Sequence, residues 1–186
     1  MPETVAIIGA GPLGRWLALQ AARGGFRLLL EDVMPHNLHH AQEFLRQQLG
    51  PEALSPAQGP GVAFVSTIED AVREADLAID CVPDELESKL EIFCLLDRMA
   101  PPRTVLATPT MRLSIADLAS CTYRADKCVA IAQEAASLAE AGSGEVLLHT
   151  TNKTSADTVA LLTRFWSRLG FTARFAPDPA EAAAGS

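Results

Sequence analysis

Three glycines near the amino terminus have the spacing of a dinucleotide-binding turn. Gly9, Gly11 and Gly14 follow the apolar run at residues 5–8. In such turns the first glycine permits a sharp strand-to-helix bend, the second lets a pyrophosphate approach the backbone, and the third lets the helix pack on the strand. The helix that follows directs its unpaired N–H groups at the phosphates. The turn residues that we expect to contact a cofactor are Gly9, Ala10, Gly11, Pro12, Leu13 and Gly14.

An acidic residue completes this pattern. Asp32 ends the next apolar run, 18 residues after Gly14. A carboxylate at this place accepts hydrogen bonds from a ribose 2′-hydroxyl and repels a 2′-phosphate, so the pattern predicts NAD or NADH rather than NADP. The alternative is an α/β domain that keeps the turn and binds no dinucleotide.

Short apolar runs alternate with amphipathic stretches along the whole chain, which is typical of buried strands and the helices that cover them. We expect strands at 5–8, 26–30, 62–65, 77–82, 104–107, 128–131, 145–149 and 171–175, and helices at 13–23, 37–49, 67–72, 83–99, 115–119 and 154–169. This order predicts an α/β fold of the Rossmann type, with a doubly wound, mostly parallel sheet and helices on both faces. The dinucleotide-binding domain is expected over residues 1–176, with a Pro/Gly-rich connector near residues 50–61 and a disordered tail at 177–186.

Ligands bind such sheets in the crevice at the carboxyl ends of the strands. Val82, Pro83 and Glu85 follow the strand at 77–82, and Pro109 follows the strand at 104–107, so we expect them to line this crevice. Glu85 has two readings: contact with the nicotinamide ribose, or an acid favoured by the dipole at a helix N-terminus.

Composition excludes several function classes. The 186 residues carry a net charge of −8, which argues against nucleic acid or an anionic membrane as the partner. No apolar stretch approaches the ~20 residues that span a bilayer. The first residues lack a basic signal-peptide region, so a cytoplasmic location is expected.

No metal site is predicted. The four cysteines form no Cys-x-x-Cys pair and are expected to be free thiols: Cys81, Cys94, Cys121 and Cys128. His36, His39 and His40 have a helical spacing that would let them clasp a metal, but no acidic partner is evident, so we expect a polar first turn beside the adenine.

Four stretches resemble the NAD-binding domain of the 3-hydroxyacyl-CoA dehydrogenases. They are residues 5–14 with Asp32, 75–89, 96–115 and 153–170. The resemblance implies an oxidoreductase of fatty acid metabolism that moves a hydride between NAD and a small hydroxyacyl or hydroxy-acid substrate. Lys89 matches a family lysine close to cofactor and substrate, although a solvated helix lysine is an equal reading.

The chain departs from this family where the chemistry would occur. The position of the catalytic histidine holds Ala132, and its glutamate partner falls near Leu147, with Glu145 available after a small shift. The family's Ser-Asn-Thr-Ser stretch contains Pro109 and Met111 here. Alanine cannot take a proton and methionine cannot donate a hydrogen bond, so no catalytic residue is assigned. His149 would replace the base only if its strand delivers it to the crevice.

The family's helical second domain would begin about where this chain ends, so we expect it to be absent and the exposed crevice to favour a homodimer. Two function hypotheses remain. One is an NAD-dependent dehydrogenase-like enzyme with an altered substrate or borrowed catalytic groups. The other is a non-catalytic NAD/NADH-binding sensor or partner subunit.

Overall fold

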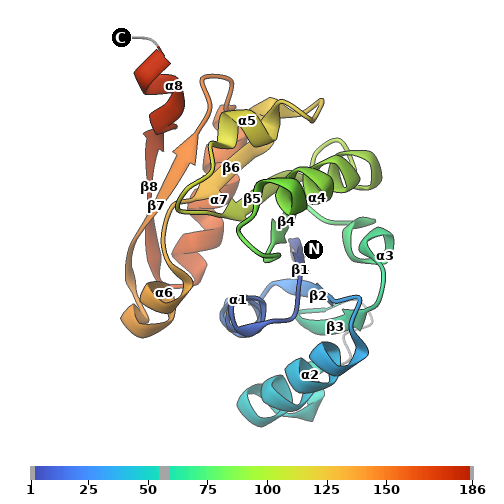
Figure 1. The fold of residues 1–186 in the computed structure, drawn as a ribbon. Helices are drawn as coiled ribbons and strands as arrows, with labels where there is room; N and C mark the ends of the chain where they lie inside the picture. The colour runs from blue at the N-terminus through green and yellow to red at the C-terminus, as the bar shows by residue number, and fades with distance from the viewer. Residues whose placement is uncertain (1–2, 55–58, 185–186) are drawn as a thin grey trace.

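The strands of the computed structural model form a single sheet (Figure 1). The structure describes residues 3–54 and 59–184. Within them the strand order is β3-β2-β1-β4-β5-β6-β7-β8. The strands are β1 (Thr4–Ile8), β2 (Arg27–Glu31), β3 (Gly61–Val65), β4 (Leu77–Asp80), β5 (Val105–Pro109), β6 (Cys128–Ile131), β7 (Gly144–Thr150) and β8 (Phe171–Pro177). Only the β6–β7 pairing among these is antiparallel, which confirms the mostly parallel, doubly wound sheet.

Helices cover both faces of the sheet. The α-helices are α1 (Pro12–Arg23), α2 (Pro35–Leu49), α3 (Ile68–Val72), α4 (Leu86–Met99), α5 (Ile115–Ala119), α6 (Ala135–Ala141), α7 (Ala156–Arg168) and α8 (Pro179–Ala184). Two short 3₁₀ turns lie at Pro51–Leu54 and Ala125–Lys127. One apolar cluster packs α1, α2 and α7 on the sheet, and a second packs α3, α4 and α5 on the opposite face (Figure 1).

The central strands are apolar without alternation because both of their faces are covered. In β1, Val5 and Ile7 belong to the first cluster, whereas Ala6 and Ile8 belong to the second. This alternation also decides which face each polar residue at a strand end reaches, and it therefore governs the site described below.

Among the strands and α-helices, the structure differs from the sequence expectations by more than two residues in three places. Helix α4 begins at Leu86 rather than residue 83, because a tight turn, in which Glu85 N donates to Pro83 O at 2.8 Å, precedes it. Helix α6 was not expected. Beyond Pro177, where we expected a disordered tail, the chain continues into α8, and Asp178 accepts hydrogen bonds from Ser114 Oγ and Ala116 N at 2.7 and 2.9 Å. Connector residues 55–58 and tail residues 185–186 lie outside the described residues.

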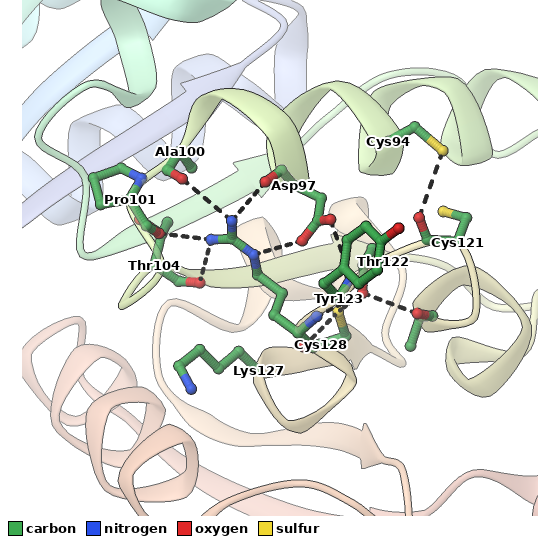
Figure 2. Close-up of polar contacts among 12 residues, drawn as sticks. Cys94, Asp97, Ala100, Pro101, Thr104, Cys121, Thr122, Tyr123, Lys127 and Cys128 are labelled. Carbon is green, nitrogen blue, oxygen red and sulfur yellow. Dashed lines mark hydrogen bonds and ion pairs between the residues drawn. The ribbon is translucent and has the colours of Figure 1, made fainter.

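A buried arginine fixes the carboxyl end of α4. The Arg124 side chain donates to Asp97 Oδ1 at 2.7 Å and to the backbone oxygens of Asp97, Ala100, Pro101 and Thr104. Figure 2 shows these acceptors converging from the helix end and from the loop that leads into β5. The guanidinium thus satisfies carbonyl groups that a helix end leaves without partners.

No helix within the described ranges is long and apolar enough to cross a membrane.

Candidate functional site

The glycine turn adopts the geometry that its spacing predicts. Gly9 has φ +105°, in the left-handed region that favours glycine, and its N–H donates to Glu31 O at 2.8 Å. A Cβ on Gly14 would lie 1.8 Å from Gly9 O, so only glycine permits this contact between α1 and the turn. A Cβ on Gly11 would enter open space, which leaves room for a ligand to approach the backbone there.

The amino end of α1 is open to an anion. Gly11 is its N-cap residue and no side chain caps it, while Pro12 occupies the first turn. The unpaired N–H groups and the positive end of the helix dipole are therefore available to a phosphate. These features fit the pyrophosphate of a dinucleotide.

Asp32 is held firmly beside the turn. Its Oδ2 accepts hydrogen bonds from Ala10 N at 2.9 Å and Asn37 Nδ2 at 3.1 Å, and its Oδ1 accepts one from Met34 N at 2.8 Å. A carboxylate has about four lone-pair sites, so it retains capacity to accept a ribose hydroxyl.

A cleft of about 360 Å³ lies at the carboxyl ends of β1, β2 and β4. Its lining is Ile8, Gly9, Gly11, Glu31, Asp32, Val33, Asn37, Ile68, Cys81, Val82, Pro83 and Ile92. The structure thus brings five expected residues together: Gly9, Gly11, Asp32, Val82 and Pro83. The other expected residues do not line it: Ala10, Pro12, Leu13, Gly14, Glu85, Lys89 and Pro109.

Lys89 lies in the protein interior instead. Its Nζ donates to Asp80 Oδ1 at 3.1 Å, Thr108 Oγ1 at 2.9 Å and Val82 O at 3.4 Å, and the residue is 1% exposed. This excludes the solvated lysine considered from the sequence. Burial raises the pKa of Asp80 and the Lys89 charge partly offsets that rise.

Glu31 is a cleft residue that the sequence analysis missed. It is 2% exposed, and its Oε1 has no hydrogen-bond partner among the described residues. Burial, with a smaller effect from the Asp32 charge, raises its pKa from 4.5 to about 7. The available signal was a second acid beside Asp32 at the end of an apolar run.

The positions matched to the family's catalytic pair are neighbours in space. Ala132 N donates to Leu147 O at 2.9 Å, across the β6–β7 edge. Neither side chain is able to exchange a proton. Pro109 ends β5 and is half-buried, and the neighbouring Thr110 N donates to Ile131 O at 3.1 Å.

His149 does not join the described cleft lining. His149 lies on β7, which runs antiparallel to β6, and it pairs in register with Ala130 of β6. Its charge contributes to lowering the pKa of Asp178. Hydrogen bonds from Ala116 N and Ser114 outweigh burial and lower the pKa of Asp178. Across residues 3–54 and 59–184, no three His, Cys, Asp or Glu side chains are grouped to hold a metal.

A larger cleft, of about 510 Å³, lies near the amino ends of β1 and β2. Its arginines are bound to acids: Arg27 to Glu74 at 2.6 Å, Arg103 to Asp76 at 2.9 Å and Arg164 to Glu3 at 2.8 Å. Because these charges are already neutralised, this cleft is the weaker candidate for an anionic ligand.

Comparisons with known proteins agree with the geometry. Residues 4–173 match the family described as 3-hydroxyacyl-CoA dehydrogenase, NAD binding domain. A probable 3-hydroxybutyryl-CoA dehydrogenase of Bacillus subtilis is 29% identical over 135 residues, which are 68% of this chain and 47% of the relative. A 5-formyl-3-hydroxy-2-methylpyridine 4-carboxylate 5-dehydrogenase of Mesorhizobium japonicum is 33% identical over 123 residues, 63% of this chain and 40% of the relative. The chain spans under half the length of both.

Solved structures share the fold. The crystal structure of (S)-3-hydroxybutyryl-CoA dehydrogenase from Ralstonia eutropha superposes with a TM-score of 0.81 and 21% identity, covering 96% of this chain and 64% of that one. The family match over 4–173 and the dinucleotide geometry lead to one conclusion. The chain belongs to the NAD-binding domain family of the 3-hydroxyacyl-CoA dehydrogenases, and NAD is its cofactor.

Proposed function

We propose that the cleft beside the glycine turn binds NAD and NADH, and that this binding is the function of the domain itself. Gly9, Gly11 and the open end of α1 would hold the pyrophosphate. Asp32 would accept the 2′-hydroxyl of the adenosine ribose, and Val82 and Pro83 would contact the cofactor from the end of β4. The observation that carries the proposal is the meeting of the glycine turn, Asp32 and an apolar wall in one 360 Å³ cleft.

Specificity for NAD follows from the charge of Asp32. A 2′-phosphate would meet a carboxylate already oriented by Ala10 N, Met34 N and Asn37. Like charges at this distance repel, and no described arginine or lysine lines the cleft to compensate. We therefore expect NADPH to bind far more weakly than NADH.

Catalysis by this domain alone would lack a proton acceptor. NAD, when bound, supplies a hydride acceptor at its nicotinamide ring, but oxidation of an alcohol also needs a base for the hydroxyl proton. The neighbouring positions Ala132 and Leu147 offer none. This supports a binding role, as in a sensor or partner subunit, over turnover by these residues.

A second candidate is a dehydrogenase acting on a small hydroxyacyl or hydroxy-acid substrate, with its base supplied from elsewhere. The family match favours it. Titration of the purified chain with NADH, followed by calorimetry, tests the binding role and should give micromolar affinity. Absence of binding to either cofactor form contradicts it, whereas NADH-coupled turnover with a panel of 3-hydroxyacyl-CoA and 3-hydroxy acid substrates would favour the second candidate.

Two further expectations concern the cell. We propose a cytoplasmic location for the protein and a homodimer that covers the crevice. Light scattering that shows a monomer would contradict the dimer.

A further inference from the structure

Glu31 is an acid that the dinucleotide-binding pattern does not require. The pattern uses glycines to admit the pyrophosphate and one acid, here Asp32, to hold the ribose. Glu31 precedes Asp32 at the end of β2, so its side chain leaves the strand on the opposite face. It lies on the face of α3 and α4, with Leu29 of the same strand.

The surroundings of Glu31 are those of a ligand site. The residue lines the cleft together with Ile68 of α3 and Ile92 of α4 and is itself 2% exposed. No hydrogen bond reaches its Oε1 from any described residue. A buried polar atom that lacks a partner is costly, so an unpartnered carboxyl oxygen at a cleft wall favours a ligand that provides one.

The position within the cleft identifies the part of the ligand. Asp32, one residue away, marks the adenosine ribose, and Gly11 marks the pyrophosphate. Ile68 belongs to α3, a helix that contacts β2, and it gives the cleft an apolar wall at this end, where a flat aromatic base is the remaining group to be bound.

We propose that Glu31 binds the edge of the adenine base of NAD and is a specificity-determining residue of this site. The inference rests on the proposed function, since it requires NAD in this cleft.

The hydrogen-bonding groups match. A neutral carboxyl presents one O–H donor and one C=O acceptor side by side. Adenine presents an amino donor next to a ring-nitrogen acceptor, so the two edges pair through two hydrogen bonds. An ionised carboxylate only accepts and would leave the ring nitrogen without a donor. The pKa of about 7 keeps a large share of Glu31 neutral near neutral pH.

Neighbouring groups leave Glu31 as the residue expected to control the pH response. The other titratable cleft residues are Asp32, which follows β2, and Cys81, which follows β4 and whose thiol pKa is raised by burial. Helices α3 and α4 contribute isoleucines to the lining, and α2 contributes Asn37, with the exposed His36 just before it. Ligand binding that requires the protonated form weakens as the pH rises through the pKa.

The test uses the whole chain, calorimetric titration with NAD⁺ and ADP-ribose, and a pH series from about 6 to 8.5. Wild-type affinity should fall roughly fivefold to tenfold across the series, as expected for loss of one or two hydrogen bonds. Glu31→Gln keeps one donor and one acceptor, so its affinity should stay near the pH 6 wild-type value throughout. Glu31→Leu should bind both ligands roughly tenfold more weakly at pH 6, while its affinity for nicotinamide mononucleotide should not change.

Glu140→Gln, an exposed glutamate on α6, is the matched control and should follow the wild type. The inference is overturned if Glu31→Leu binds ADP-ribose as tightly as the wild type, or if Glu31→Gln retains the wild-type pH dependence. If Glu31→Leu does not fold, as judged by circular dichroism, the pH dependence of ligand affinity in Glu31→Gln still tests the proposal. Failure of the wild type to bind NAD⁺ or ADP-ribose would instead refute the proposed function.

Discussion

The two ends of α4 each bury an ion pair, but the pairs differ in how fully they are satisfied. At the amino end Lys89 binds Asp80, whose Oδ2 has no partner within the described chain. At the carboxyl end Arg124 binds Asp97 with a 2.7 Å contact and also donates to four backbone oxygens. The first pair lies at the carboxyl ends of β4 and β5, on the cleft side, and the second lies at the far end of the helix (Figure 2).

This difference distinguishes the Arg124 cluster, which has a structural role, from the Lys89 cluster, which adjoins the proposed ligand site. Burying charges is costly unless every donor and acceptor finds a partner. The Arg124 cluster meets that condition and fixes α4 on the sheet. The Lys89 cluster does so less completely, because Asp80 Oδ2 lacks a partner. Of the four buried side-chain atoms without a partner among the described residues, three belong to Glu31, Asp80 and Asp84, at or just after the carboxyl ends of β2 and β4, and the fourth is Trp166 Nε1 of α7.

The largest effect on stability should come from the carboxyl end of α4, where the buried ion pair is fully hydrogen-bonded. Arg124→Ala removes the partner of buried Asp97 and leaves the last carbonyls of α4 unpaired, which should lower the free energy of unfolding by about 3–5 kcal/mol. Urea denaturation followed by circular dichroism measures this. Lys127→Ala, which breaks a more exposed pair with Asp126, should change it by less than about 1 kcal/mol. Equal effects of the two substitutions would contradict the comparison.

At the amino end of α4, Lys89→Met should lower the free energy of unfolding by a smaller amount, about 2–4 kcal/mol at neutral pH. The loss is smaller because Asp80 is able to take up a proton when its partner is removed. Burial already raises the pKa of Asp80. The loss should therefore shrink in acid, as measured by urea denaturation between about pH 5 and 8. Adding Asp80→Leu to Lys89→Met should restore part of the stability, and a further loss would show that this pair does not behave as a buried ion pair.

Next in size is a change to cofactor binding. Asp32→Ala removes the acceptor proposed for the ribose and should weaken NADH binding by about 1.5–3 kcal/mol, a tenfold to hundredfold loss. Calorimetric titration measures it. The same substitution should narrow the preference for NADH over NADPH, and an unchanged preference would show that Asp32 does not set it.

The last effect concerns the pH dependence that Glu31 gives to the stability of the protein without ligand. Its pKa is about 7 in the folded state and 4.5 ordinarily, so the folded protein retains a proton that the unfolded chain releases between these pH values. The free energy of unfolding should therefore fall as pH rises through this window and level off above it. Glu31→Gln should abolish this fall. A wild-type stability that rises across the window would contradict the raised pKa.

Local spacing accounts for what the sequence predicted well. The turn at Gly9, Gly11 and Gly14 and the acid at Asp32 are short-range features, and the alternation of apolar strands and helices fixes a doubly wound sheet. The buried environment of Lys89 could not be predicted from local spacing in the sequence. Its partners Asp80 and Thr108 lie on two other elements, and only tertiary packing places all three together.

Glu31 was missed for a related reason. In a strand apolar on both faces, alternation does not reveal which side has a cleft, so two adjacent acids look equivalent. The direction of β7 also depends on long-range pairing, because it runs antiparallel to β6, so the place of His149 required the structure.

The position of β1 has a consequence for synthesis of the chain. It precedes the other strands of this sheet in the chain, yet it lies inside the sheet, between β2 and β4. One edge of this strand, which is apolar from Val5 to Ile8, therefore stays open until residues 77–80 have left the ribosome. Open apolar strand edges invite aggregation. We expect nascent chains cut short before β4 to depend on chaperones, and chains extended through β5 to be released from them.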